Sequence, residues 1–204
     1  YALRGSTTAA NNIGANNTAL GHSALMSNTS GDYNTAIGYA LYNNTTGDFN
    51  TAIGGASLAV NTTGSNNVSI GVNTMHDNTT ASANLAIGDN ALFTNTTKQQ
   101  STAVGFEAMR YADSAAGGAI TYNTALGYQA LRGSTTAASN TGTSNTAIGH
   151  SALMGNTSGV GNTALGTSAL MNHTSTNSNT AIGARALYMD CLLYTSPSPR
   201  DVEE

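Results

Sequence analysis

The sequence predicts an all-β protein, a parallel β-solenoid (β-roll) of about ten coils with 16–22 residues each. Three observations predict it. A pentapeptide, Asn-Thr-Ala-Ile/Leu-Gly, returns ten times with small variations; its copies are 16, 17 or 22 residues apart; and each unit is too short to bury a core alone. Such units become stable only by stacking on one another. The glycines that close the copies are Gly21, Gly38, Gly54, Gly71, Gly88, Gly105, Gly127, Gly149, Gly166 and Gly183.

Each coil holds two short apolar runs. In the first coil these are Thr18–Leu20 and Ala24–Met26, separated by Gly21 and followed by an Asn-Thr-Ser-Gly turn. Runs of three to five residues between turn formers are typical of strands, so we expect two short strands per coil. Stacked coils would pair in parallel, about 4.8 Å apart. We expect the closing glycines to take backbone angles that a side chain forbids.

Two aliphatic columns run through the repeat, and we expect both to fill the core. An alanine, replaced once by Ser69, precedes each member of the first column. Because neighbouring strand residues point to opposite faces, we expect these alanines to face outward, against another chain. The first column is Leu20, Ile37, Ile53, Ile70, Ile87, Val104, Leu126, Ile148, Leu165 and Ile182, and its isoleucines serve with the glycines as structural anchors of the repeat. The second column is Leu25, Leu41, Leu58, Met75, Leu92, Met109, Leu131, Leu153, Leu170 and Leu187.

Asparagines recur at two positions of the coil. One set opens the strands, and we expect its side chains to stack as an amide ladder that Ser101 interrupts once. The other set lies in Asn-x-Ser/Thr sequons, which would accept glycans in a eukaryotic secreted protein. We favour the interpretation that the turn chemistry of the repeat creates the sequons. The strand-opening set is Asn17, Asn34, Asn50, Asn67, Asn84, Asn123, Asn145, Asn162 and Asn179, and the sequon set includes Asn28, Asn44, Asn61, Asn78, Asn95 and Asn156.

The chain divides into a repeat region, 1–190, which we interpret as a section of a longer fibre, and a non-repeat tail, 191–204. Coils six and seven are five residues longer than the norm, and we expect the excess, in Tyr111–Tyr122 and Arg132–Ser144, to form loops on one edge. The segment Ala2–Ala10 returns unchanged at Ala130–Ala138, which indicates duplication. The tail holds the single cysteine and both prolines, and we expect it to lie outside the fold.

Composition narrows the function classes. Charged residues make up 8% of the chain, its net charge is −4, and no basic cluster occurs, which disfavours nucleic-acid binding. No run approaches the roughly 20 apolar residues that span a bilayer. We therefore expect membrane contact only through an anchor missing from this chain.

The polar residues suggest no catalytic, cofactor-binding or metal site. We expect the histidines His22, His76, His150 and His173 to be solvated surface residues, because no Cys, Asp or Glu recurs beside them. Asp32 and Asp48 are interpreted as turn aspartates, because the calcium-binding Gly-Gly-x-Gly-x-Asp repeat is absent. We therefore expect no enzyme activity and no cofactor.

Aromatic residues gather at coil edges, where they could contact a sugar or protein or pack between neighbouring rolls. They are Tyr33, Tyr39, Tyr42, Phe49, Phe106, Tyr111, Tyr122 and Tyr128.

The run Asn-Thr-Ala-Ile-Gly-His-Ser-Ala-Leu stands at 145–153, and nine related copies occur elsewhere in the chain. These repeats resemble the head repeats of YadA-like trimeric autotransporter adhesins and related bacterial and phage tail-fibre proteins. The resemblance covers about residues 2–190. It implies a left-handed β-roll in an obligate homotrimer, at a bacterial cell surface or in a phage or virion tail fibre. It also implies a structural and adhesive segment that presents contacts to a host surface protein, matrix or glycan, with the ligand-binding residues undetermined. The coils here are longer than the family's commonest repeat.

Two other functions are compatible with a β-solenoid. An ice-binding solenoid would use a threonine ladder that fails in coils six and seven, formed by Thr29, Thr45, Thr62, Thr79, Thr96 and Thr157. A carbohydrate-cleaving tailspike would need paired carboxylates, which these coils lack.

Overall fold

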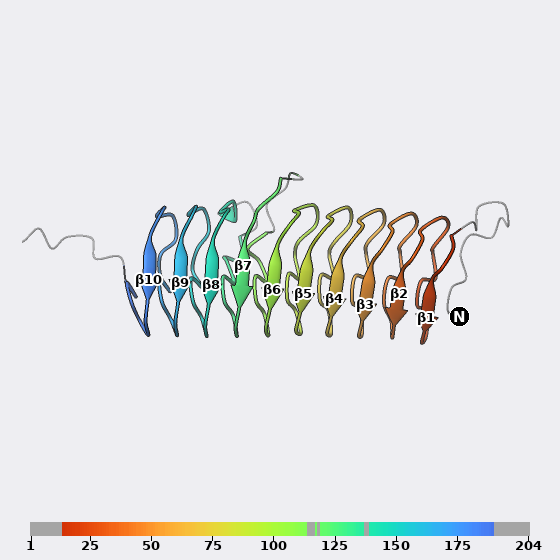
Figure 1. The fold of residues 1–204 in the computed structure, drawn as a ribbon, viewed down its shortest axis with the longest axis horizontal. Coiled ribbons are helices and arrows are strands. Elements are labelled where there is room, and N and C mark those ends of the chain that lie inside the picture. Colours follow the sequence, from red (N-terminus) through yellow and green to blue (C-terminus); the bar gives the residue numbers. More distant parts are fainter. Residues whose placement is uncertain (1–13, 114–116, 118, 137–138, 190–204) are drawn as a thin grey trace, which may run out of the picture.

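The computed structural model describes residues 14–189 except 114–116, 118 and 137–138. Ten three-residue strands form one parallel sheet in chain order, and the chain winds between them as a β-solenoid, as predicted (Figure 1). Among the described residues, no helix is long and apolar enough to cross a membrane. The strands are β1 (Thr18–Leu20), β2 (Thr35–Ile37), β3 (Thr51–Ile53), β4 (Val68–Ile70), β5 (Leu85–Ile87), β6 (Thr102–Val104), β7 (Thr124–Leu126), β8 (Thr146–Ile148), β9 (Thr163–Leu165) and β10 (Thr180–Ile182).

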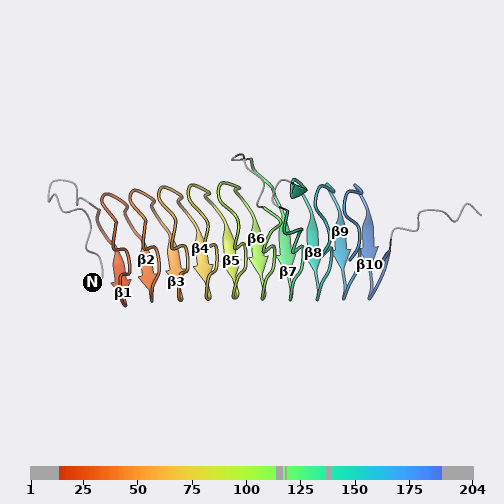
Figure 2. The ribbon, with the colours of Figure 1, turned by 180° about the vertical axis from the view of Figure 1, so that it is seen from behind.

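The register of the sheet pairs equivalent residues of successive coils. β2 pairs with β3 through Thr35↔Thr51, Ala36↔Ala52 and Ile37↔Ile53, and the same scheme continues along the rod. The longer coils keep it, because β6, β7 and β8 still align threonine with threonine. The described part of the extra chain leaves the stack on one side, next to β7, as the view from behind also shows (Figure 2). Insertion therefore changes the surface without changing the sheet.

Only the first apolar run of each coil is a strand; the expectation of a second strand is wrong. At the centre of the second run stands a residue with φ between 48° and 52°, in the left-handed region, in every coil from Leu25 to Leu187. The backbone therefore bends sharply instead of extending. Its N–H groups still bond to the following coil, as from Leu25 N to Ala40 O at 3.2 Å.

The core contains the strand alanines, the second aliphatic column and further alanines, such as Ala40, that directly precede members of that column. The prediction that the strand alanines face outward is therefore wrong. Ala36 and Ala52 are fully buried, and so is Leu41 at the bend. The expectation that the first aliphatic column also fills the core is wrong: this column points away from the interior, and Leu126, inside the stack, is 48% exposed. The interior is narrow because leucines and asparagines fill its far side, so only a small side chain fits on the inner face of the strand.

The ten closing glycines take positive φ values, as predicted. At Gly54, with φ 133°, an added Cβ would lie 2.2 Å from the carbonyl oxygen of Gly71 in the next coil. No other residue fits at that distance, so the tight corner after each strand needs glycine.

The predicted asparagine ladder is present inside the rod. Asn34 is buried, and its Oδ1 accepts the backbone N–H of Asn50 at 2.9 Å. Its Nδ2 donates across the interior to the carbonyl of Gly47 at 2.8 Å. The same two bonds recur at Asn50 and Asn145, so each amide joins two coils and closes its own coil.

The sequon asparagines form a second buried ladder. Asn44 donates from Nδ2 to Asn28 Oδ1 at 2.9 Å and to the Gly47 carbonyl at 3.0 Å. Asn61 repeats both bonds one coil later. These amides are interior, which fits a role in the turn and leaves them inaccessible for glycosylation in the folded chain.

The inward position of alanine generates a first prediction. Ala86→Leu is expected to destabilise the fold by about 1–3 kcal/mol, because the added atoms overpack a filled interior. Urea unfolding followed by circular dichroism measures it. Leu85→Thr, on the outer face, restores the residue found in most coils and is the matched control, with an expected change below about 0.5 kcal/mol. Equal effects of both variants would contradict the assignment.

A second prediction concerns backbone strain. Ala83 is exposed and has φ 58°, which costs an L-residue about 1–2 kcal/mol. Ala83→Gly is therefore expected to stabilise the chain, by about 0.5–1 kcal/mol after the entropy cost of glycine. The strand-interior variant Ala86→Gly should lower the urea midpoint instead. Destabilisation by Ala83→Gly would show that the left-handed residue carries no strain.

Candidate interaction surfaces

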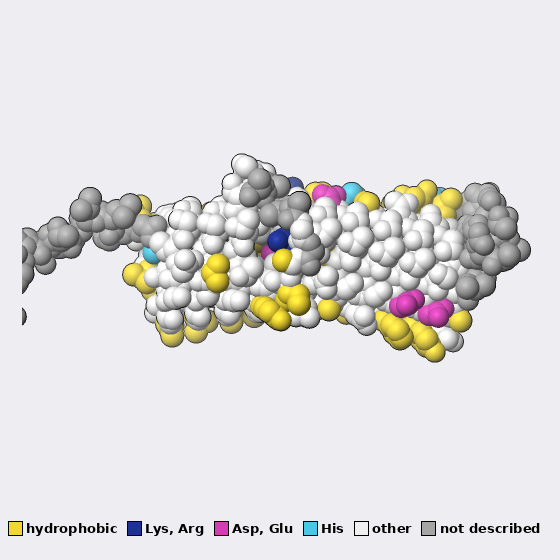
Figure 3. Space-filling view, turned by 90° about the horizontal axis from the view of Figure 1, so that it is seen from above, with side chains coloured by type: hydrophobic (Ala, Val, Ile, Leu, Met, Phe, Trp, Pro, Cys, Tyr) yellow, Lys and Arg dark blue, Asp and Glu magenta, His cyan; other side chains and the backbone are white. Residues whose placement is uncertain are grey.

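The outer face of the sheet carries two straight rows. One is aliphatic, from Leu20 to Ile182, and its members are half-buried or exposed. The other consists mainly of threonines, beginning with Thr18 and Thr35, whose hydroxyls make no hydrogen bond to the described residues. In the space-filling view hydrophobic side chains follow one long edge of the rod (Figure 3). The stripe is continuous over ten coils, roughly 45 Å. Exposed apolar patches of this kind are typical of contact surfaces.

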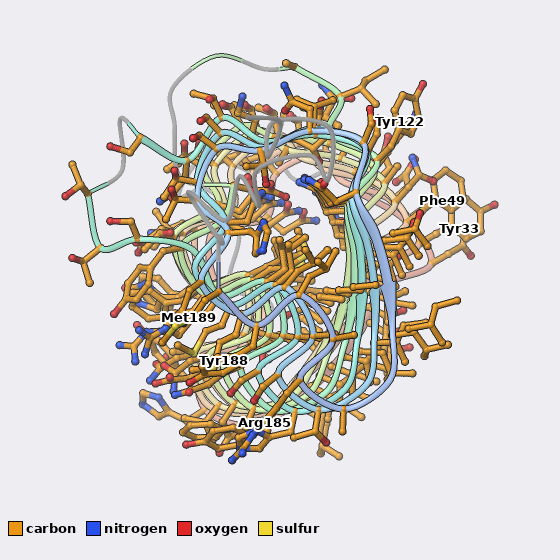
Figure 4. The ribbon with its side chains drawn as sticks, turned by 90° about the vertical axis from the view of Figure 1, so that its left-hand side faces the viewer. Tyr33, Phe49, Tyr122, Arg185, Tyr188 and Met189 are labelled. Atoms are coloured by element: carbon orange, nitrogen blue, oxygen red, sulfur yellow. The ribbon has the colours of Figure 1, made fainter. Side chains whose placement is uncertain are left out.

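An aromatic pair stands near β2 and β3. The rings of Tyr33 and Phe49 stack with centroids 5.0 Å apart and planes within 3°, and both side chains are more than half exposed. Figure 4 shows them projecting from the rod side by side. Each directly precedes a strand-opening asparagine and follows an aspartate. The aromatic residues at coil edges therefore include an outward-pointing pair.

Asp32 and Asp48 act in turns, as predicted. Asp32 Oδ1 accepts the N–H of Ala15 at 2.6 Å, and Asp48 Oδ1 accepts the N–H of Asp32 at 2.7 Å. Ser65 has the same role in the following coil, where its Oγ accepts from Asp48 N at 2.9 Å. These side chains therefore link successive coils. Within the described residues, no three His, Cys, Asp or Glu side chains lie close enough together to hold a metal ion.

The histidines differ in setting. His22 and His150 are exposed, as predicted, and His150 stacks on Tyr128. His76 bonds to Asp77 and stacks on Phe93. His173 is only 5% exposed, so the expectation of a solvated side chain is wrong there. It stands three residues after Leu170, where other coils hold a sequon asparagine, and takes that interior place.

The threonine ladder considered for ice binding uses its hydroxyls internally. Thr29 Oγ1 donates to the carbonyl of Thr45 at 2.9 Å, and Thr45 Oγ1 to that of Thr62 at 3.0 Å. Thr62, Thr79 and Thr157 repeat this bond. These donors are therefore committed to the next coil, in contrast to the threonines on the strand face.

A buried acid lies where Ser101 interrupts the strand-opening ladder. Asp113 is 1% exposed and fills the space beside Ser101, whose side chain is too short to act as the usual asparagine. Its carboxylate accepts hydrogen bonds from Ser101 Oγ and from Asn123 Nδ2, the latter at 3.1 Å. Burial raises the pKa of Asp113, and the hydrogen bonds and the charge of Lys98 oppose that rise only in part. Sequence reasoning missed this group because Asp113 lies in an insertion outside the repeat.

Asp113 predicts an unusual dependence of stability on pH. Because the folded-state pKa lies above the ordinary value of 3.8, its contribution is fully present below 3.8 and is lost as pH rises through the folded pKa. Asp113→Asn keeps the shape without the charge. The variant is expected to raise the urea midpoint at pH 7.5 and to match the parent near pH 3.5. A parent chain that instead gains stability over this range relative to Asp113→Asn would show that Lys98 outweighs burial.

No protein-family model, no curated protein and no solved structure matches this chain.

Proposed function

We propose that this chain is a rod segment of a trimeric, surface-exposed fibre that presents adhesive contacts to a host cell or matrix. The supporting observation is the aliphatic stripe, which stays in register over all ten strands on the outer face of the sheet. A single chain would leave this stripe in contact with water. Burying it against another chain would lower the free energy, because apolar surface is removed from water. The resemblance to YadA-like head repeats supports both the number of three chains and the extracellular location.

The stripe suits association between copies of the chain. Every coil presents one branched aliphatic side chain, such as Ile53 or Ile87, beside a threonine or, in two coils, another aliphatic residue, so the surface repeats at the coil spacing. Identical parallel rods can then match coil against coil along their whole length. Many weak contacts along such a rod add up through multivalency, which also suits adhesion.

The assembly is tested by light scattering on the full chain. The expected mass is three times the 20.6 kDa of one chain. Ile87→Asp brings a carboxylate from each copy into the apolar contact, at a cost of about 3 kcal/mol or more, and should yield folded monomers. Thr167→Asp is the control, because Asp89 stands at the equivalent position of another coil. A folded parent monomer at micromolar concentration would contradict the proposal.

Adhesion needs its own measurement. Beads coated with the assembled chain should be retained on cultured cells or on a deposited extracellular matrix, in contrast to beads coated with the Ile87→Asp monomer at equal mass. Equal retention of the two preparations would remove the link between assembly and adhesion.

A second candidate, ice binding, is favoured by one observation. The strand-face threonines form a regular row with free hydroxyls beside the aliphatic row, unlike the ladder considered from the sequence. Because this face would be covered in a trimer, the two functions exclude each other at this surface. A monomer that shows thermal hysteresis, lost in Thr146→Tyr, would support ice binding, and a trimer without hysteresis would remove it.

A further inference from the structure

Coils six to eight carry a column of stacked rings outside the core. Phe106, Tyr128 and His150 each follow a closing glycine, with centroid distances of 5.3 and 5.1 Å and planes within 11°. Phe106 and Tyr128 are each more than 40% exposed. Because the rings stack face to face, they turn their edges to solvent, and the edge of an aromatic ring carries partial positive charge. The column therefore favours oxygen-rich or anionic groups.

Two arginines stand in adjacent coils near this column. Arg110 and Arg132 follow the buried residues Met109 and Leu131, and the N–H of Tyr111 bonds to the Arg132 carbonyl at 2.8 Å. The described part of the chain holds only four Lys and Arg residues, so two in adjacent coils concentrate its positive charge.

The two guanidinium groups differ in their partners. Arg110 pairs with Glu107, whose other oxygen accepts from Gln129 Nε2 at 2.8 Å. The guanidinium carbon of Arg110 also lies 5.6 Å from the ring centre of Phe93. Arg132 has no carboxylate within 4.0 Å among the described residues. Its Nε, like that of Arg110, is buried without a hydrogen-bond partner. A partly buried cation without a counter-charge is stabilised by a neighbouring anion.

The ring column and the arginines form one surface. Arg110 pairs with Glu107, which directly follows Phe106, so the two columns are neighbours around the rod. In coil two, which is one residue shorter between these columns, Tyr39 and Tyr42 stack on each other at 5.1 Å. Figure 4 labels Arg185 and Tyr188, which stand in the columns of Gln129 and Arg132, on one side of the rod, away from Tyr33, Phe49 and Tyr122. The basic–aromatic patch (Phe106, Arg110, Tyr128, Arg132 and His150) is therefore separate from the aromatic pair.

We propose that the basic–aromatic patch binds an anionic polysaccharide. A carboxylate or sulfate group would accept hydrogen bonds from the planar fork of Arg132, and the sugar ring would lie against the edges of Phe106 and Tyr128. Nucleic acid fits less well, because two arginines on a chain of net charge −4 cannot neutralise a run of phosphates. This inference deepens the proposed adhesive function by naming a ligand class, but it does not need the trimer.

Binding to immobilised polysaccharides tests the patch in the full chain. Dextran sulfate supplies sulfate, polygalacturonate supplies carboxylate, and unmodified dextran is the neutral control. We expect binding to at least one anionic probe and none to dextran. Comparison of the sulfated and carboxylated probes then identifies the acid group.

Arg132→Ala should weaken that binding about tenfold. Arg132→Gln, which keeps the side-chain stem, should weaken it similarly and guards against a packing effect. Arg185→Ala, which removes a lone cation from coil ten, should have no effect.

Three outcomes would overturn the proposal: equal loss in the Arg132 and Arg185 variants, equal binding to dextran and the anionic probes, or tighter binding to single-stranded DNA. The folded Ile87→Asp monomer separates this inference from the proposed fibre. If it keeps site-level affinity for the anionic probe, the patch is independent of assembly. If the parent is a trimer that binds neither anionic probe, the polysaccharide proposal fails while the fibre proposal stands.

Discussion

The convergence of two asparagine side chains on one glycine carbonyl is the interaction on which the rest of the fold depends. In the second coil, Asn34 and Asn44 both donate to the carbonyl oxygen of Gly47, at 2.8 and 3.0 Å. The first amide also binds the next coil's backbone, and the second binds the previous coil's amide. Three short segments of one coil, and two neighbouring coils, are thereby fixed at one point. Because these bonds are buried, losing one partner leaves a polar group unsatisfied, which costs more than the bond contributes.

This geometry explains which residues the repeat admits. A Cβ at Gly47 would lie 2.3 Å from the Gly64 carbonyl and 2.6 Å from Asn44 Oδ1, so in the second coil the amides converge on a position that favours glycine. In two later coils the amides converge in the same way on the carbonyls of Ala81 and Lys98. The amides and the leucine at the bend then fill the interior, and alanine is what remains possible on the strand. Larger aliphatic residues of the same strand are forced to the outer face. The apolar stripe is therefore a consequence of the narrow interior.

Much of the fold could be predicted from the sequence, because a repeat superimposes ten versions of the same physical requirement. The parallel strands, the closing glycines and the strand-opening amide ladder all follow from residues that recur at one position. The direction of the strand side chains did not follow, because Thr-Ala-Ile offers no polar alternation and a large side chain is ordinarily the one buried. The left-handed backbone conformation at the second aliphatic column was also missed, because leucine seldom adopts it and no residue pattern predicts it.

The candidate sites were harder to predict for the opposite reason: they depend on departures from the repeat. The neighbouring positions of Arg110 and Arg132 become visible only when the coils are aligned across a 22-residue spacing, as residues that each follow a core side chain. The burial of Asp113 needed the insertion to fold back beside Ser101. In a solenoid whose coils are nearly interchangeable, the recurring positions hold the coils together and present one uniform aliphatic face. A ligand can distinguish one place along such a rod only where the repeat is broken. Coils six to eight, with the insertions of coils six and seven, the two arginines and the ring column, therefore carry local chemistry that the uniform face lacks.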